Sequence, residues 1–383
     1  MEDLYLAALA TIVPGLGPMR TLQAVKALGS AKAVFEATGE QLAELGLFNE
    51  RAIANFLRGR RQADPELLGQ MCRAQNIRVI GYFNPDYPDS LKEIHNPPLA
   101  LYIRGHLPQS GYHVGIVGSR QATPYGLKVA RYIAKSLVAD NITVISGGAS
   151  GIDSAAHAAA LESGGRTVVV LGCGVDIAYP SENQRLFQGV LQKGALVSEY
   201  PPGTAPQARF FPARNRIIVG LSRAVVVCEA AAKSGALITA RLAADEHREV
   251  YCVPGNIFEP TSVGCHGMLK QGAKLLDDVR EIFQDREEYL AKEQMGREGN
   301  LFAAGAPANV AVEKSAAVQL HPAAENLSPL GKQIYNLLTQ GPLGTEQLVE
   351  QTGVVLADLS MELLEMQVKG LIETDQAQRY YRI

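Results

Sequence analysis

TVISGGASGIDSAAHAAAL, Thr143 to Leu161, is the stretch of this chain that best indicates the fold. It begins with a short β-branched run, passes through the small residues Ser146 to Gly151, and leads into a helix that we expect to start near Ser154. A strand, a glycine-rich turn and a helix make the repeating unit of an α/β fold. The turn also presents backbone N–H groups at a helix N-terminus, where an anion such as a phosphate binds.

The same pattern recurs along the middle of the chain. Further short, largely β-branched runs end in Gly, Ser or Pro, and helical periodicity follows several of them. These runs start at Val114, Thr143, Thr167, Ala224 and Glu249. The alternation predicts an α/β fold with a doubly wound parallel sheet that has helices on both faces. In such sheets, ligands bind at the carboxyl ends of the strands.

Other regions flank the predicted sheet. The N-terminal region is expected to be a small, all-helical, SAM-like domain, in which Ile12–Ser30 and, more weakly, Leu42–Leu57 resemble helix–hairpin–helix elements. An Ala-, Gly- and Pro-rich stretch indicates a flexible linker, and the tail, with three helical segments and a β-ribbon, indicates a winged helix. The predicted limits are 1–65 for the helical domain, 66–285 for the sheet domain, 286–326 for the linker and 327–383 for the winged helix.

Composition limits the classes of function. The chain has 383 residues and a net charge of −3, so it is no histone-like polycation, and any nucleic-acid site must be a local basic patch. Its five cysteines show no CxxC spacing, which argues against a zinc site or a disulfide framework and favours a reducing cytoplasm. We expect no signal peptide, no membrane span, no metal and no cofactor.

Loops suited to phosphate follow several predicted strands. They are Gly118–Arg120, Ser146–Asp153, Gly172–Leu186 and Ala230–Ala240. One glycine loop alone is weak evidence, because tight strand–helix turns also use glycine for packing. Several such loops on one sheet edge predict an extended ligand with many phosphates rather than a single mononucleotide.

An arginine-rich segment strengthens this prediction. FFPARNRIIVGLSRAVVV, Phe210 to Val227, together with the residue before it, contains Arg209, Arg214, Arg216 and Arg223 and no acid. We interpret the apolar run that follows as a buried strand with the arginines gathered at its mouth. Guanidinium groups bind phosphate oxygens in pairs, and aromatic rings stack on bases, so the segment predicts a nucleic-acid ligand.

Known nucleotide and catalytic motifs are missing. The first strand–helix turn reads GIVGSRQ rather than GxGxxG, and no GxxxxGK[ST] sequence occurs. His157 is expected to pack inside the protein, and Cys173 has no partner base in the sequence. We therefore expect a binding protein and not an enzyme.

The motifs together resemble those of DNA-processing protein A, the DprA/Smf family. The matching segments include GIVGSRQAT, VISGGASGIDSAAHAAAL, LGCGVDIAYPSENQRLF, SEYPPGTAPQARFFPARNRIIVGLS, EAAAKSGALITA and VPGNIFEPTSVGCHGMLKQGA, in this order. The resemblance implies an extended Rossmann-like fold that binds single-stranded DNA and dimerises through the same domain. It further implies protection of the strand, delivery to the RecA recombinase, and a role in natural transformation or homologous recombination.

The resemblance also implies which residues contact DNA. Some members have a lysine shortly before the Phe, and Arg209 takes its place here. The loops would bind phosphates, Phe211 would stack on a base, and the following arginines would complete the pocket. The implied DNA-binding residues are Gly118, Ser119, Arg120, Gly147, Gly148, Ala149, Ser150, Gly151, Arg209, Phe211, Arg214, Asn215, Arg216, Lys233 and Ser234.

Two alternatives remain open from the sequence. One is a nucleotide-processing enzyme of the lysine-decarboxylase-like (LOG) class, which has similar phosphate loops but a PGGxGT-type sequence that is missing here. The other is a regulatory scaffold whose winged helix reads duplex DNA. The predicted recognition helix carries Asp358, Glu362 and Glu365, which would repel a phosphate backbone, so a protein-contact or regulatory role is the better prediction for this domain.

Overall fold

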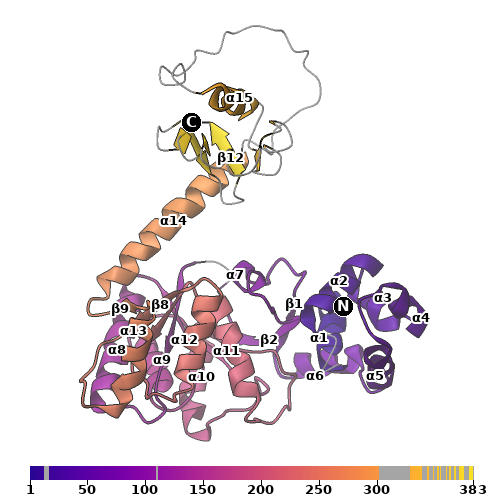
Figure 1. The fold of residues 1–383 in the computed structure, drawn as a ribbon. Coiled ribbons are helices and arrows are strands. Elements are labelled where there is room, and N and C mark those ends of the chain that lie inside the picture. Colours follow the sequence, from indigo (N-terminus) through magenta and orange to yellow (C-terminus); the bar gives the residue numbers. More distant parts are fainter. Residues whose placement is uncertain are drawn as a thin grey trace. The chain divides into compact units, whose positions relative to one another are not determined.

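The computed structural model describes residues 1–12, 17–108 and 111–301, and shorter stretches between 328 and 382. The chain forms two compact units, Met1–Leu301 and Phe302–Ile383 (Figure 1). Among the described residues, no helix has the length and apolar character needed to cross a membrane.

A nine-stranded sheet forms the centre of the first unit. In spatial order its strands are β1 (Arg78–Gly81), β2 (Ala100–Gly105), β6 (Ala195–Ser198), β5 (Thr167–Val170), β4 (Thr143–Ser146), β3 (His113–Val117), β7 (Ala224–Val227), β8 (Glu249–Cys252) and β9 (Lys274–Leu275). The strands from β6 to β9 in this order are parallel, whereas β2 is antiparallel to both β1 and β6. The predicted doubly wound α/β sheet is confirmed.

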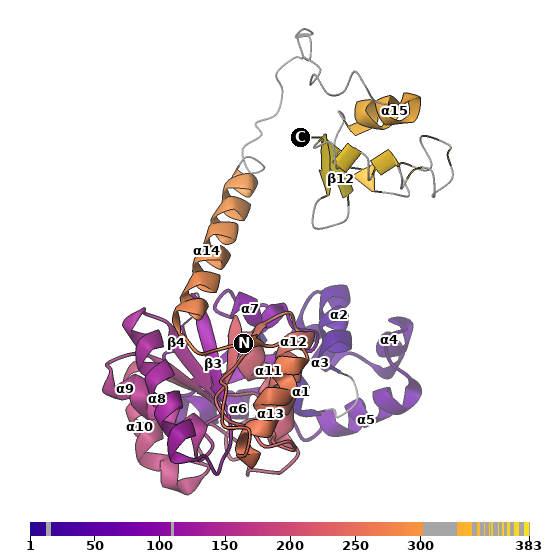
Figure 2. The ribbon, with the colours of Figure 1, turned by 60° about the vertical axis from the view of Figure 1, so that its left-hand side comes forward.

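Helices cover both faces of this sheet (Figure 2). One face carries α8 (Pro124–Ala139), α9 (Ile152–Glu162) and α10 (Gln184–Lys193), and the other carries α7 (Asp89–Lys92), α11 (Phe210–Leu221), α12 (Ala236–Asp245) and α13 (Val263–Lys270). Every residue of β3 to β7 is buried, as expected for strands covered on both sides. Their β-branched runs are therefore confirmed as strands.

The arginine-rich segment has a different structure from the one expected. Phe210–Leu221 is helix α11, and Pro212 lies in its first turn, where a missing backbone N–H breaks no helical hydrogen bond. Arg223 comes just before β7, at the amino end of that strand, and its Nη1 lies 2.6 Å from Glu93 Oε2. The interpretation of four arginines gathered at one strand mouth is wrong, because Arg223 lies at the opposite edge of the sheet.

Within residues 1–12 and 17–74, which the structure describes, six helices precede the sheet. They are α1 (Glu2–Ile12), α2 (Pro18–Leu28), α3 (Ala31–Glu36), α4 (Gly39–Glu44), α5 (Glu50–Arg60) and α6 (Pro65–Ala74). Leu6 and Phe56 from these helices share one hydrophobic cluster with Tyr102 of β2 and Val190 of α10. The helical region therefore packs on the edge of the sheet. The turn of the first predicted helix–hairpin–helix element, residues 13–16, lies outside the described residues.

The first unit ends in a long helix, α14 (Arg280–Leu301). Its first turns close the core beside β3 through Ile282, which is fully buried. The predicted linker, 286–326, begins inside this helix, which is rich in the strong helix formers Glu, Lys, Gln, Ala and Leu. The rest of that linker, from residue 302, lies outside the described residues.

The second unit contains α15 (Pro329–Leu337) and a three-stranded antiparallel sheet of β10 (Leu343–Gly344), β12 (Arg379–Arg382) and β11 (Ile372–Thr374). A small core includes Ile334, Leu363 and Met366. Helical segments beside a short antiparallel sheet agree with the predicted winged helix. Of the three acids on the predicted recognition helix, Asp358 and Glu365 lie outside the described residues.

Candidate nucleic-acid interface

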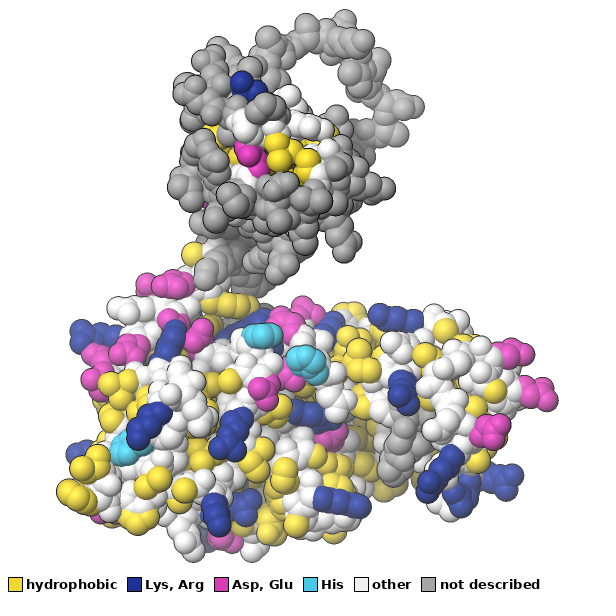
Figure 3. Space-filling model, in the orientation of Figure 1, with side chains coloured by type: hydrophobic (Ala, Val, Ile, Leu, Met, Phe, Trp, Pro, Cys, Tyr) yellow, Lys and Arg dark blue, Asp and Glu magenta, His cyan; other side chains and the backbone are white. Residues whose placement is uncertain are grey.

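The carboxyl ends of five parallel strands meet at one edge of the central sheet. The loops that follow them are residues 118–123 after β3, 147–151 after β4, 171–180 after β5, 228–235 after β7 and 253–259 after β8. Figure 3 shows Lys and Arg side chains spread over one face of the first unit, several of them along its lower edge. The sequence-predicted loops are therefore neighbours in the fold.

The loop after β3 presents Arg120 to solvent. A Cβ on Gly118 would lie 2.5 Å from Ile152, so this close approach requires glycine. The Ser119 N–H donates to the carbonyl of Glu229 at 2.8 Å, and the Ser119 carbonyl accepts from the Ile152 N–H at 3.2 Å. These contacts fix the backbone of the loop, while the Arg120 side chain stays exposed.

The loop after β4 is held from below by a buried carboxylate. Asp153 Oδ2 accepts the Gly147 N–H at 3.2 Å and the Ala149 N–H at 3.3 Å. The N–H groups of Ser150 and Gly151 have no acceptor within the described part of the chain. They lie at the N-terminus of α9, where a phosphate is favoured by both the free donors and the helix dipole.

Two glycines give this loop its shape. Gly148 and Gly151 have φ values of +68° and +83°, a region that other residues rarely adopt. A Cβ would lie 2.6 Å from Val169 at Gly148, and 2.4 Å from the Ser119 carbonyl oxygen at Gly151. The β4 loop can therefore pack directly against the β3 loop, which brings the N–H donors close to the segment that carries Arg120.

Arg214 lies beneath these loops and not on the surface. Only 4% of the residue is exposed, and its Nη1 donates to the carbonyl of Gly147 at 2.7 Å and to that of Val170. Burial lowers the pKa of Arg214 to about 10, and nearby Asp153 opposes this shift. Burial likewise raises the pKa of Asp153 above its usual range. This side chain connects the ends of β4 and β5 and has no free face for DNA.

Arg216 is also engaged within the protein. Its Nη1 and Nη2 bind the two carboxylate oxygens of Glu199 at 2.8 and 2.6 Å, and 13% of the Arg216 side chain is exposed. Asn215, between the two arginines, is half-buried. The Glu199 carboxylate thus neutralises Arg216 in the protein as it stands.

Phe211 forms the first aromatic surface of the edge. The guanidinium carbon of Arg120 lies 5.7 Å from the centre of the Phe211 ring. The ring of Tyr179, which is 43% exposed, lies 5.3 Å from Phe211 at an interplanar angle of 34°. A cation above an aromatic face is attractive in itself, and the grouping offers flat surfaces next to a phosphate-binding charge.

A second aromatic pair lies one residue earlier in α11. Phe210 stacks on Tyr200 with ring centres 4.1 Å apart, and the exposed Arg209 lies 5.1 Å from the Phe210 ring. The two arginine–aromatic groupings therefore adjoin each other at the start of α11. Burial raises the pKa of Tyr200 above 10, so its hydroxyl stays protonated at neutral pH.

Lys233 and Ser234 lie in the loop after β7. Lys233 is exposed and forms no ion pair with any described residue. The Ser234 N–H donates to the Ala231 carbonyl at 2.9 Å, and its Oγ accepts the Ala236 N–H at 3.3 Å. Lys233 thus offers a free cation at the same sheet edge, whereas Ser234 helps to start α12.

Sequence reasoning missed part of the aromatic surface. The sequence-predicted DNA-binding residues do not include Tyr179 or Tyr200. The sequence signal for them is weak, because Tyr200 comes ten residues before Phe210 and Tyr179 comes thirty residues before Arg209. Their stacking depends on how the loop after β6 folds back onto α11, which no local pattern predicts.

Comparison with known proteins agrees with this architecture. The family model for DNA recombination-mediator protein A matches residues 78–287, and the model for the DprA winged helix domain matches residues 318–377. Protein Smf of Synechocystis sp. is 33% identical over 384 residues, which cover 97% of this chain and 96% of that protein.

Solved structures show the same fold. DNA processing protein A from Streptococcus pneumoniae has a TM-score of 0.65 and 32% identity, and the match covers 75% of this chain and 98% of that one. DNA processing protein A from Helicobacter pylori, whose structure addresses its single-stranded DNA binding mode, has a TM-score of 0.50 and 28% identity, covering 57% and 96%. The predicted resemblance is confirmed: this chain belongs to the DNA recombination-mediator protein A, or DprA/Smf, family.

Proposed function

We propose that this protein binds single-stranded DNA along the carboxyl edge of its central sheet. The observation that carries the proposal is the grouping of Arg120 over Phe211 beside the free N–H donors of Ser150 and Gly151. A cation and N–H groups bind phosphates, and an exposed aromatic face stacks on bases of any sequence. The Helicobacter pylori relative, described as binding single-stranded DNA, supports the same ligand.

The biological role that we propose is recombination mediation. The protein would protect incoming or processed single strands and load the RecA recombinase onto them, in natural transformation or homologous recombination. It would act in the cytoplasm as a homodimer through its central domain and without enzymatic activity. Family membership supports this role, and the five cysteines, all free and buried, suit a reducing compartment.

The test compares two arginines that differ in position. Arg120 lies in the loop after β3, whereas the exposed Arg166 directly precedes β5 at the opposite edge of the sheet. Fluorescence anisotropy with a labelled oligothymidylate should show tight binding by the wild type and by Arg166→Ala, and much weaker binding by Arg120→Ala. Both variants remove one positive charge, so a difference between them reports on the site and not on net charge.

The mediator role has its own readout. On single strands coated with a single-strand-binding protein, wild type and Arg166→Ala should shorten the lag before RecA filaments form, and Arg120→Ala should not. If the wild type binds DNA but does not shorten the lag, the proposed RecA loading is refuted and the proposed DNA binding is retained. Absence of DNA binding, together with hydrolysis of a nucleoside monophosphate, would instead favour the LOG-type enzyme.

A further inference from the structure

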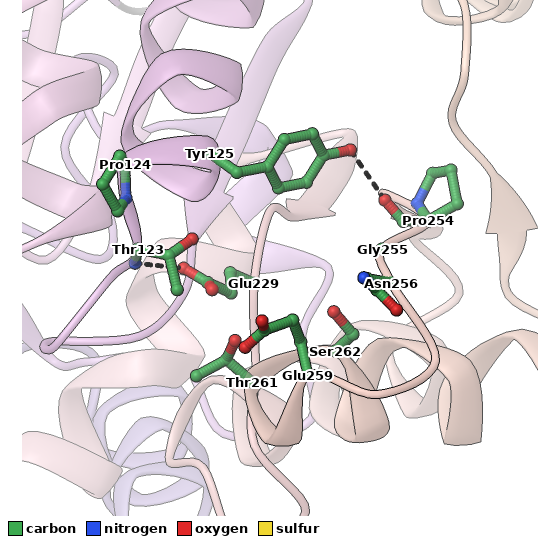
Figure 4. Close-up of a pocket in the computed structure, with 10 residues that line it drawn as sticks. All are labelled: Thr123, Pro124, Tyr125, Glu229, Pro254, Gly255, Asn256, Glu259, Thr261 and Ser262. Carbon is green, nitrogen blue, oxygen red and sulfur yellow. Dashed lines mark hydrogen bonds between the residues drawn. The ribbon is translucent and has the colours of Figure 1, made fainter.

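A cavity of about 510 Å³ opens at the same sheet edge, beside the loop that carries Arg120 (Figure 4). Thr123 contributes to it from the end of the β3 loop and Tyr125 from the first turn of α8. Glu229 comes from the loop after β7, and Asn256, Glu259 and Thr261 come from the segment after β8. None of the sequence-predicted DNA-binding residues lines it. The phosphate-binding surface therefore does not account for this cavity.

The cavity lies where the order of the sheet reverses. From β3 the chain adds β4, β5 and β6 in one direction, and β7, β8 and β9 lie in the other. The helix after β3 covers one face of the sheet and the helix after β7 covers the other, so the loops diverge and leave a crevice. Ligands of open α/β sheets bind at such a switch point.

Two carboxylates give the lining of the cavity a negative charge. Glu229 is 4% exposed, and its Oε2 accepts the Thr123 N–H at 2.9 Å, while its Oε1 accepts no hydrogen bond from any described residue. Thr261 Oγ1 is buried and has no partner among the described residues. The lining includes the carboxylates of Glu229 and Glu259 but no Lys or Arg, so it disfavours a phosphate and favours a group that donates hydrogen bonds.

An aromatic face completes the lining. The Tyr125 hydroxyl donates to the Pro254 carbonyl at 2.8 Å, which fixes a ring that is 50% exposed (Figure 4). In the segment between Asn256 and Glu259, Ile257 and Phe258 are 74% and 84% exposed. A fixed ring beside acceptors suits a flat ligand with donor groups on its edge.

We propose that the cavity receives one amine-bearing nucleobase of the strand whose backbone lies on the phosphate loops; this rests on the proposed function. The Cα atoms of Arg120 and Thr123 are three residues apart, hence within about 10 Å of each other, so the cavity opens next to the loop that carries the phosphate-binding arginine. Carboxylates accept hydrogen bonds from the N4 amine of cytosine. Thymine has a carbonyl oxygen at that position, which would face the Glu229 carboxylate.

The experiment compares labelled (dC)15 and (dT)15 at pH 8, with the full chain and three variants. Thr261→Val keeps the shape of the side chain and removes only the unpartnered hydroxyl. Glu229→Gln removes the charge and keeps the size. Thr11→Val serves as the matched control, because Thr11 is exposed on α1 and does not line the cavity.

We expect the wild type and Thr11→Val to bind (dC)15 roughly 5- to 20-fold more tightly than (dT)15. In Thr261→Val and Glu229→Gln the ratio should fall to within about 2-fold, through weaker (dC)15 binding alone. If Glu229→Gln also weakens (dT)15 binding, the substitution has moved the β3 loop. The ratio of (dC)15 to (dT)15 affinity in Thr261→Val then decides whether the proposal holds.

Two results would overturn the proposal. The first is equal affinity of the wild type for (dC)15 and (dT)15. This result would overturn the proposal even if free deoxycytidine monophosphate raises Tm, because the cavity would then bind a free nucleotide but no base of the bound strand. The second is a ratio that Thr261→Val leaves unchanged. Neither result touches the proposed function, which is tested separately by comparing oligothymidylate binding of the wild type and Arg120→Ala.

Discussion

Replacing Arg214 by Met should lower the stability of the protein by removing a buried charge beneath the phosphate loops. The guanidinium is 4% exposed, donates to the carbonyls of Gly147 and Val170, and lies near the buried Asp153. Methionine fills much of the same volume but leaves two buried carbonyls without donors and a buried acid without its counter-charge. Leaving two buried carbonyls unpaired, at about 1–3 kcal/mol each, beside a buried acid that has lost its neighbouring cation should cost about 3–5 kcal/mol.

Thermal unfolding followed by circular dichroism measures this loss. For a domain of this size, 1 kcal/mol shifts Tm by about 2–4 °C, so Arg214→Met should lower Tm by roughly 6–20 °C. Arg120→Ala, on an exposed side chain, should change stability by no more than about 0.5 kcal/mol.

A double variant sharpens the test. Asp153→Leu combined with Arg214→Met removes both buried charges, so it should cost less stability than the sum of the two single changes, although the backbone groups of Gly147, Ala149 and Val170 stay unpaired. The reasoning is refuted if Arg214→Met melts like the wild type and yet loses DNA affinity as Arg120→Ala does. That result would place Arg214 on the DNA and not under the loop.

Two further predictions concern other residues of the fold. Phe211→Ala should weaken binding of a single strand roughly 5- to 100-fold through lost stacking, whereas Phe211→Tyr should retain most of the affinity in the same anisotropy titration; equal loss in both would argue against stacking. Burial lowers the pKa of His157 from 6.5 to about 3, so the unfolded chain binds a proton that the folded protein excludes. The free energy of unfolding should therefore decrease as the pH is lowered below 6.5, by about 2 kcal/mol at pH 5, as measured by urea unfolding. His157→Gln should make this pH dependence weaker.

The sequence was most informative where one local pattern decides the structure. The runs from Val114, Thr143 and Thr167 could be predicted as buried strands because runs of four or five largely β-branched residues that end in glycine-rich turns suit few other structures. Parallel strands then place their carboxyl ends at one edge, so the meeting of the loops followed from the fold class.

The sequence could not predict which arginines are exposed and which are buried or paired within the protein. Arg120 and Arg214 carry the same side chain beside small residues, but only the packing of α11 under the β4 loop shows that Arg214 is buried. Arg216 is neutralised by Glu199, seventeen residues away in sequence. Such pairings depend on long-range packing, which neither periodicity nor composition encodes.

The switch-point cavity was missed for a similar reason. Its acceptors Glu229 and Thr261 lie 32 residues apart in sequence, in segments that follow different strands. Each residue alone is unremarkable, and the loop sequences indicated phosphate rather than base recognition. Only the order of β3, β7 and β8 in the sheet brings these groups together.

The salt dependence of binding tests the central claim most directly. Titrating an oligothymidylate at several salt concentrations gives a slope of log K against log salt that counts phosphate contacts, at about 0.7 per contact for a single strand. The account predicts that Arg120→Ala lowers this slope by about 0.7 and that Arg166→Ala, at the opposite edge, leaves it unchanged. Equal slopes for wild type and Arg120→Ala would contradict the placement of the DNA backbone at the carboxyl edge of the sheet.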